Sequence, residues 1–337
     1  MWAMSLQKPG GELSLAKLAV PLPGPEEIQI RVRACGVCRT DLHIVDQDLP
    51  AHKSPVIPGH EVVGEVTGLG PEVRGFSIGD RVGVPWLGST CHHCPYCLDQ
   101  RENLCDNPQF TGYDRDGGYA QYMVADARYC FAIPDKYDDL HAAPLLCAGL
   151  IGYRAYLMTG NVQSIGLYGF GAAAHILIQV AKHQGKRVLA FTRPDDMRSQ
   201  DFARSLGADW AGDSMQEPPV QLDAAIIFAP VGDLVPAALR ATRKGGVVVC
   251  AGIHMSNIPS FPYSLLWGER VLRSVANLTR ADGEAFFSAI QEFDLHTSPT
   301  AFPMHEANRA LSAVRNGSID GAAVLVMKDG WFPHSAP

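Results

Sequence analysis

One stretch of the sequence, residues 36–61, gathers side chains that bind metal ions and carry protons. These side chains are Cys38, Thr40, His43, His60 and Glu61. Thiolate, imidazole and carboxylate groups are zinc ligands, and a catalytic zinc takes three protein ligands and leaves a fourth position for water or substrate. Cys147, in the apolar run LLCAG, is the candidate for the ligand still needed. A lone buried cysteine or histidine is more often part of a core than a ligand. The hypothesis of a zinc site therefore depends on the occurrence of several candidate ligands together.

A second cluster has the spacing Cys-x2-Cys-x2-Cys-x7-Cys. Its members are Cys91, Cys94, Cys97 and Cys105. Four thiolates close a tetrahedral shell and leave no open position, which is the arrangement of a structural zinc. His92 and His93 could replace one of the sulfurs and stay unassigned. We expect a structural zinc lobe at about residues 88–108.

Composition limits the classes of partner and the compartment. The 337 residues suggest about two domains. Lys and Arg number 28 against 35 Asp and Glu, and without a basic block we expect no nucleic-acid partner. The amino terminus lacks a signal-peptide pattern, and polar turns break the uncharged run 155–181, so we expect no membrane span. Nine cysteines, an odd number, favour metal-bound thiolates in a reducing compartment, the cytoplasm.

The elements that position these residues change character along the chain. Residues 27–34 alternate apolar and polar side chains, which predicts a half-buried strand, and many short strands follow among glycines. From about residue 149, strands alternate with helices, the pattern of a parallel, doubly wound sheet. The fold class is therefore α/β, with a β-rich first domain and a second domain built on a parallel sheet.

The segment IGLYGFGAAAH carries a phosphate-binding fingerprint. Gly169 permits a tight turn, Gly171 lets the backbone approach a pyrophosphate, and Ala174 provides the small side chain that helix and strand packing requires. The fingerprint follows a predicted strand and opens a helix whose first residues, beginning near Ala172, offer N–H groups to the phosphates.

The residues at the end of the next predicted strand indicate which of the two nicotinamide dinucleotides, NAD or NADP, is bound. Thr192 and Arg193 stand where an acidic residue would otherwise accept hydrogen bonds from the ribose, and a guanidinium there would pair with a 2′-phosphate. We therefore expect NADP rather than NAD. The alternative is that Asp195 or Asp196 contacts the ribose; each lies beyond a proline, roughly 7–10 Å past the strand end.

Over nearly its whole length the sequence resembles the zinc-containing medium-chain alcohol dehydrogenases, in the order and context of the residues named above. The resemblance implies a GroES-like catalytic domain formed by residues 1–148 and 281–337, and a Rossmann cofactor domain formed by residues 149–280. It implies two zinc ions per chain, one catalytic and one structural. It also implies a homodimer or homotetramer that acts on a small alcohol or aldehyde.

The resemblance assigns roles to the residues of the first cluster. It makes Cys38, His60 and Cys147 the ligands of the catalytic zinc, with Glu61 beside the metal as an occasional ligand. The resemblance makes Thr40 the group that takes the alcohol proton and His43 the group that receives it through the cofactor ribose. Asp41 is a candidate to orient His60. Cys91, Cys94, Cys97 and Cys105 match the structural-zinc lobe of the family.

The substrate pocket and three departures from the family complete the comparison. Trp86 matches an aromatic residue that lines the pocket in relatives, although a core tryptophan is the alternative. Val45 and Leu49 stand where some small-alcohol enzymes carry bulky aromatics, which favours larger primary or aromatic alcohols. The departures, which bear on cofactor affinity, are Ile151, Ala322 and the alanines of the glycine fingerprint. Two alternatives remain: a polyol or other secondary-alcohol dehydrogenase, and a nucleotide-binding redox sensor without turnover.

Overall fold

The computed structural model describes residues 1–319 and 321–328 and divides into two compact units. The first unit contains residues 1–147, 279–287 and the described residues from 297 onward; the second contains 148–278 and 288–296. By its contacts, the segment 288–296 groups with the second unit. His296 exchanges hydrogen bonds with the Gln179 side chain, and Phe293 stacks on His183 at 4.4 Å, which ties this segment to the second unit.

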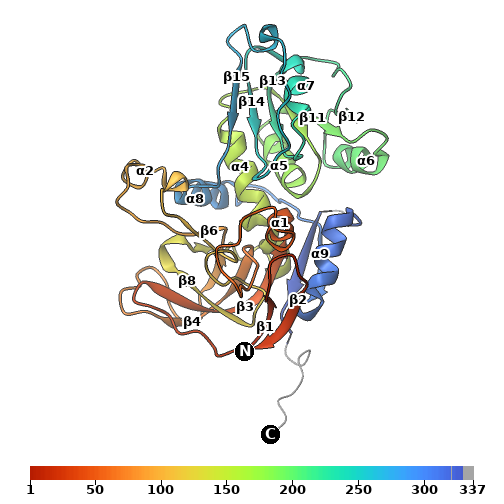
Figure 1. Ribbon diagram of the computed structural model, residues 1–337. Coiled ribbons are helices and arrows are strands. Elements are labelled where there is room, and N and C mark those ends of the chain that lie inside the picture. Colours follow the sequence, from red (N-terminus) through yellow and green to blue (C-terminus); the bar gives the residue numbers. More distant parts are fainter. Residues whose placement is uncertain (320, 329–337) are drawn as a thin grey trace. The chain divides into compact units, whose positions relative to one another are not determined.

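The first unit is rich in short strands (Figure 1). Its strands are β1 (Trp2–Leu6), β2 (Leu13–Lys17), β3 (Glu27–Val37), β4 (Val62–Leu69), β5 (Arg81–Val84), β6 (Leu87–Ser89), β7 (Gln109–Phe110), β8 (Tyr122–Asp126), β9 (Phe131–Ala132), β16 (Pro299–Pro303) and β17 (Ala322–Val326). The main sheet has the order β16-β17-β3-β4-β5-β9, with β8 paired to β3. The pairs β1-β2 and β6-β7 form two separate two-stranded antiparallel sheets.

Short helices connect these strands. They are α1 (Arg39–Val45), α2 (Pro95–Leu98), α3 (Asp139–Ala142) and α9 (Ala307–Asn316), with the 3-10 turns η1 (Glu102–Leu104), η2 (Ala127–Tyr129), η3 (Ala143–Leu146) and η5 (Met304–Glu306). Helix α8 (Arg280–Ala289) begins in the first unit. The predicted alternation in β3 is confirmed: Ile28, Ile30 and Val32 are at most 2% exposed and belong to the core of this unit.

The second unit contains a six-stranded parallel sheet of order β12-β11-β10-β13-β14-β15. Its elements are α4 (Ala148–Leu157), β10 (Ser164–Tyr168), α5 (Ala172–His183), β11 (Arg187–Thr192), α6 (Met197–Ser205), β12 (Trp210–Asp213), β13 (Leu222–Ile227), α7 (Leu234–Ala241), β14 (Thr242–Cys250), η4 (Tyr263–Leu265) and β15 (Val271–Ser274). The strand order reverses after β10, the switch point at which doubly wound sheets bind dinucleotides.

Among the residues that the structure describes, no helix combines the length and apolar character that a membrane crossing requires.

Candidate functional site

The first cluster is assembled where β3 ends and α1 begins. Cys38 is the N-cap of α1: its Sγ accepts a hydrogen bond from the Thr40 amide at 3.3 Å. The Asp41 carboxylate completes the capping box by accepting from the Cys38 amide at 2.9 Å. Thr40 and His43 then lie three residues apart on α1, on neighbouring positions of one helix face. The cap therefore places the sulfur and both proposed proton carriers on one short helix.

Four potential metal ligands converge in this part of the first unit. Donor atoms of Cys38, His60, Glu61 and Cys147 all lie within 4.8 Å of one another. The Cys38 Sγ is 3.1 Å from the His60 Nε2 and 4.0 Å from the Cys147 Sγ. Two sulfurs bonded to one tetrahedral zinc stand about 3.8 Å apart, so the observed spacing fits such an ion. The structure thus brings together all four residues predicted from the sequence.

The surroundings of His60 hold its ring in one orientation. His60 and Asp41 are fully buried, and the His60 Nδ1 lies 3.2 Å from the Asp41 Oδ1. This distance suits an ion pair, and the two atoms do not form a hydrogen bond of good geometry. The Trp86 ring meets the His60 ring edge to face, with centroids 5.0 Å apart. With Nδ1 directed at a carboxylate, Nε2 is left for the metal.

The electrostatics of the cluster favour a cation. The hydrogen bond between Cys38 and Cys147 is the largest cause that raises the pKa of the Cys38 thiol, and burial is the next. Burial, followed by the Cys38 charge, raises the pKa of Glu61 well above its ordinary value. Burial lowers the pKa of His60, but the charges of Asp41 and Cys38 raise it by more. Acidic groups crowded in a dry site retain protons, and a divalent ion can take the place of those protons.

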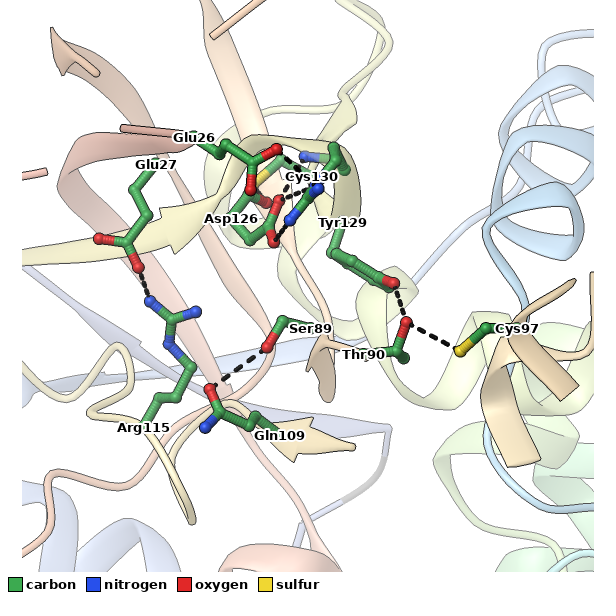
Figure 2. A network of polar contacts seen from close by, with 11 residues as sticks. Glu26, Glu27, Ser89, Thr90, Cys97, Gln109, Arg115, Asp126, Tyr129 and Cys130 are labelled. Carbon is green, nitrogen blue, oxygen red and sulfur yellow. Dashed lines mark hydrogen bonds and ion pairs between the residues drawn. The ribbon is translucent and has the colours of Figure 1, made fainter. Parts of the chain in front are cut away.

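The four cysteines of the predicted lobe also converge. The sulfurs of Cys91, Cys94, Cys97 and Cys105 lie within 4.8 Å of one another. Backbone amides of Asp106 and Cys97 lower the pKa of Cys94 to about 6, so this thiol readily becomes a thiolate, the form that binds zinc. Figure 2 shows how Cys97, in α2, faces Thr90 at the end of β6. The donor set and its geometry fit a closed metal site.

The proton carriers have a partner that the sequence reasoning missed. Thr40 is 9% exposed, and the His43 side chain is 13% exposed. The His43 Nδ1 lies 2.7 Å from an Asp48 carboxylate oxygen. Hydrogen bonding there leaves the His43 Nε2 as the nitrogen able to accept a proton. The only local signal was an acidic residue five positions after the histidine.

The three residues predicted to line the substrate pocket have different surroundings. Trp86 stacks on Phe110 with ring centroids 4.9 Å apart and contacts His60 as described above. Val45, at the end of α1, is 7% exposed and packs in the core of the first unit. Leu49 lines a small hollow together with Tyr113. Trp86 is therefore the one of the three for which the structure shows a contact with a metal-ligand candidate.

The phosphate-binding fingerprint forms a turn between β10 and α5 in the second unit. Gly169 has φ +88°, and a Cβ there would lie 2.9 Å from the backbone nitrogen of Ala229. Gly171 is the N-cap of α5 and has no atom within 4 Å of the position of an added Cβ. Ala172 is the first helical residue, and Ala174 is fully buried. The helix start carries no side-chain cap, so its amide groups can receive an anion.

The residues after β11 separate into inward and outward groups. The Thr192 hydroxyl is buried; it donates to the Arg193 carbonyl oxygen at 3.0 Å and accepts from Gln200. Arg193 is 84% exposed, with a nitrogen 3.4 Å from Asp196. Asp196 is the N-cap of α6, where it accepts from the Ser199 amide, while Asp195 is exposed. Of the two residues predicted to meet the ribose, Arg193 presents its side chain to solvent and Thr192 does not.

Comparisons with known proteins show the family to which the chain belongs. The family model described as "Alcohol dehydrogenase GroES-like domain" matches residues 24–135. The "Probable alcohol dehydrogenase AdhA" of Mycobacterium tuberculosis is 46% identical, over 97% of each chain. The solved cinnamyl alcohol dehydrogenase of Sorghum bicolor superposes with a TM-score of 0.88 at 26% identity, over 96% of this chain and 97% of that one.

A solved structure from Sinorhizobium meliloti, described as a "putative zinc-binding dehydrogenase" bound to NADP, superposes with a TM-score of 0.84 at 25% identity, over 97% of this chain and 99% of that one. The two clusters of metal ligands, the glycine turn at a parallel sheet and these similarities agree. The chain belongs to the zinc-containing medium-chain alcohol dehydrogenase family.

Proposed function

We propose that this protein is a zinc-dependent oxidoreductase that interconverts alcohols and aldehydes with NADP(H) as the favoured cofactor. The observation that carries the proposal is the convergence of Cys38, His60 and Cys147, with Glu61, at the start of the helix that bears Thr40 and His43. This donor set supplies three ligands and one further carboxylate, which matches a catalytic zinc with an exchangeable position.

In the proposed mechanism, zinc bound by this set would lower the pKa of an alcohol and polarise an aldehyde oxygen. The Thr40 hydroxyl accepts the alcohol proton while it releases its own toward His43. The His43 ring takes that proton at Nε2, because its Nδ1 is held by Asp48. Asp41 keeps the His60 ring turned toward the sulfurs. In the aldehyde-reducing direction these proton movements run in reverse.

The aromatic residues near His60 support a substrate class. Trp86 and Phe110 are stacked with an interplanar angle of 10°. Flat aromatic surfaces favour contact with aromatic or long apolar groups. We therefore propose primary alcohols with aromatic or longer chains as substrates, on the strength of the aromatic residues beside His60.

Arg193 supports the proposal of NADP. Its guanidinium is exposed beside the end of β11, and charge-assisted hydrogen bonds from arginine to phosphate are short and strong. Of the two acids that could compete for the ribose, Asp196 is already used as a helix cap, whereas Asp195 is exposed. We also propose two zinc ions per chain, one in each cluster.

The testing experiment measures initial rates of cinnamaldehyde reduction by zinc-replete protein, with NADPH and NADH at equal subsaturating concentration. We expect faster turnover with NADPH. Arg193→Ala should lower kcat/KM for NADPH by about 10-fold or more and leave NADH nearly unchanged. Arg198→Ala, which removes a positive charge in the next helix, is the control. Faster turnover with NADH, or an equal loss with both cofactors, would refute the NADP proposal.

Metal analysis tests the rest of the proposal. Two zinc ions per chain are expected, and Cys38→Ser should remove one zinc and the activity while the lobe keeps its ion. A Cys38→Ser variant with full activity would refute the catalytic site. Absence of turnover with any alcohol or aldehyde, with one zinc per chain, would instead favour a nucleotide-binding sensor. From the family we further propose a cytoplasmic homodimer or homotetramer, which sedimentation would distinguish from a monomer.

A further inference from the structure

A pair of buried hydroxyl groups connects the four-cysteine lobe to the rest of the first unit. The Thr90 Oγ1 lies 2.5 Å from the Tyr129 hydroxyl and 3.4 Å from the Cys97 Sγ (Figure 2). Thr90 is 8% exposed and Tyr129 is 2% exposed. A partly buried sulfur, a buried threonine and a buried tyrosine from three separate segments therefore form one chain of hydrogen bonds.

This contact differs in kind from those of the other three sulfurs. Backbone amides within the lobe donate to those sulfurs: Cys94 to the Cys91 Sγ, Cys91 and Asn107 to the Cys105 Sγ, and Asp106 and Cys97 to the Cys94 Sγ. Such contacts form whenever the loop takes its fold. The contact of Cys97 with Thr90 needs a particular side chain, so a substitution can remove it and keep the backbone.

The direction of the chain depends on the state of the sulfur. A metal-bound thiolate can only accept hydrogen bonds, so the Thr90 hydroxyl must donate to Cys97. The Thr90 oxygen is then free to accept the proton of the Tyr129 hydroxyl. Each of the two hydroxyl protons has an acceptor in this arrangement, and the Cys97 thiolate receives a hydrogen bond.

Tyr129 is also connected to the lobe through Arg280. The Arg280 guanidinium lies over the Tyr129 ring, 5.5 Å from its centroid. The buried Glu102 carboxylate, between Cys97 and Cys105 in sequence, accepts from the Arg280 amide at 2.8 Å and from its Nε at 3.3 Å. The lobe thus orders the arginine that covers the tyrosine, and the tyrosine orders the threonine that meets the sulfur.

We propose that Thr90 and Tyr129 are positioning residues for the metal ion of the lobe, acting through the Cys97 thiolate. The inference rests on the lobe zinc of the proposed function. Hydrogen bonds to metal ligands orient them, and their loss typically weakens metal binding by about 10–100-fold. Thr90→Val keeps the shape of the side chain and removes the hydroxyl, whereas Thr90→Ser keeps the hydroxyl.

The experiment compares zinc dissociation constants of Thr90→Val, Thr90→Ser and Tyr129→Phe by competition with a chromophoric chelator. The variants are made in the full chain and also in a Cys38→Ser background, where zinc reports on the lobe. Ser89→Ala is the matched control, because the neighbouring Ser89 hydroxyl meets Gln109 at 3.3 Å instead of a sulfur. Absorption bands of cobalt bound to the thiolates provide a second readout that packing alone would not shift.

We expect Thr90→Val to weaken lobe zinc binding by about 10-fold or more and to shift the cobalt–thiolate bands. Tyr129→Phe should change both in the same direction by less, and Thr90→Ser and Ser89→Ala should resemble the wild type. Equal constants for Thr90→Val and Thr90→Ser would overturn the inference, as would an equal loss in Ser89→Ala. A wild-type lobe without zinc would overturn the lobe assignment and this inference together. If Thr90→Val does not fold, Tyr129→Phe decides by the same criteria.

Discussion

Asp41→Asn is the substitution that best tests how the catalytic ligands are held. One Asp41 oxygen accepts from the Cys38 amide at 2.9 Å, and the other lies 3.2 Å from the His60 Nδ1. Asparagine has nearly the same shape but only one accepting oxygen. If its amide group faces His60, Nδ1 must accept a hydrogen bond from that group, and Nε2 must then carry the ring hydrogen, which blocks metal binding there. If the amide group faces Cys38, the capping box loses its acceptor.

The size of the effect follows from burial. Asp41 is fully buried, so water does not replace the lost partner. A hydrogen bond to a charged group contributes about 1.5–3 kcal/mol, which corresponds to roughly 10–100-fold in an equilibrium constant. We therefore expect Asp41→Asn to weaken zinc binding at the first cluster by about that factor and to leave the lobe zinc unchanged.

Competition of each zinc with a chelator of known affinity measures this effect, and the lobe zinc serves as the internal reference. Asp46→Asn is the matched control, because Asp46 ends the same helix at an exposed position and pairs with Arg315 at 2.6 Å. If Asp41→Asn binds the catalytic zinc as tightly as Asp46→Asn does, the reasoning about the His60 ring is wrong.

Three further predictions follow from the geometry. The raised pKa values at the first cluster mean that zinc must displace protons when it binds there. The affinity of the first cluster for zinc should therefore rise between pH 6 and 8, by about tenfold per pH unit for each proton released. Chelator titrations at several pH values measure this. Gly171→Ala should fold normally but bind dinucleotide more weakly, because its methyl group would occupy the open side of the turn. Gly169→Ala should weaken binding and also lower the melting temperature, because its methyl group would clash with Ala229. Equal melting temperatures for the two variants would contradict this. Thr40→Val should reduce kcat by about 10²–10⁴-fold with zinc retained, and His43→Gln should chiefly alter the pH profile; loss of zinc from Thr40→Val would refute its role as a proton carrier.

In the absence of its metal, the first cluster has a pH dependence of stability whose sign follows from His60. The pKa of His60 is raised in the folded chain, so its contribution to the free energy of unfolding is complete below the ordinary histidine pKa. That contribution is lost as the pH rises through the raised value. Raised carboxyl and thiol pKa values act in the same sense, because the folded state retains those protons to higher pH.

Patterns local in sequence were sufficient to predict the lobe cysteines, the glycine turn and the half-buried strand β3. The reason is physical: ligand spacing in one loop, the backbone freedom of Gly169 and the two-residue period of a strand are all set within at most about fifteen residues of chain. The parallel sheet was likewise predictable, since strands and helices alternate along the chain.

Only the tertiary structure decided which distant groups meet and where their polar atoms point. It placed the carboxylate of Asp48 beside the ring of His43. It also turned the Thr192 hydroxyl inward to Gln200. The hydrogen bond of Thr90 with Tyr129 joins residues 39 positions apart. Such contacts depend on how whole elements pack and which rotamer that packing allows, and no local pattern of residue types encodes either.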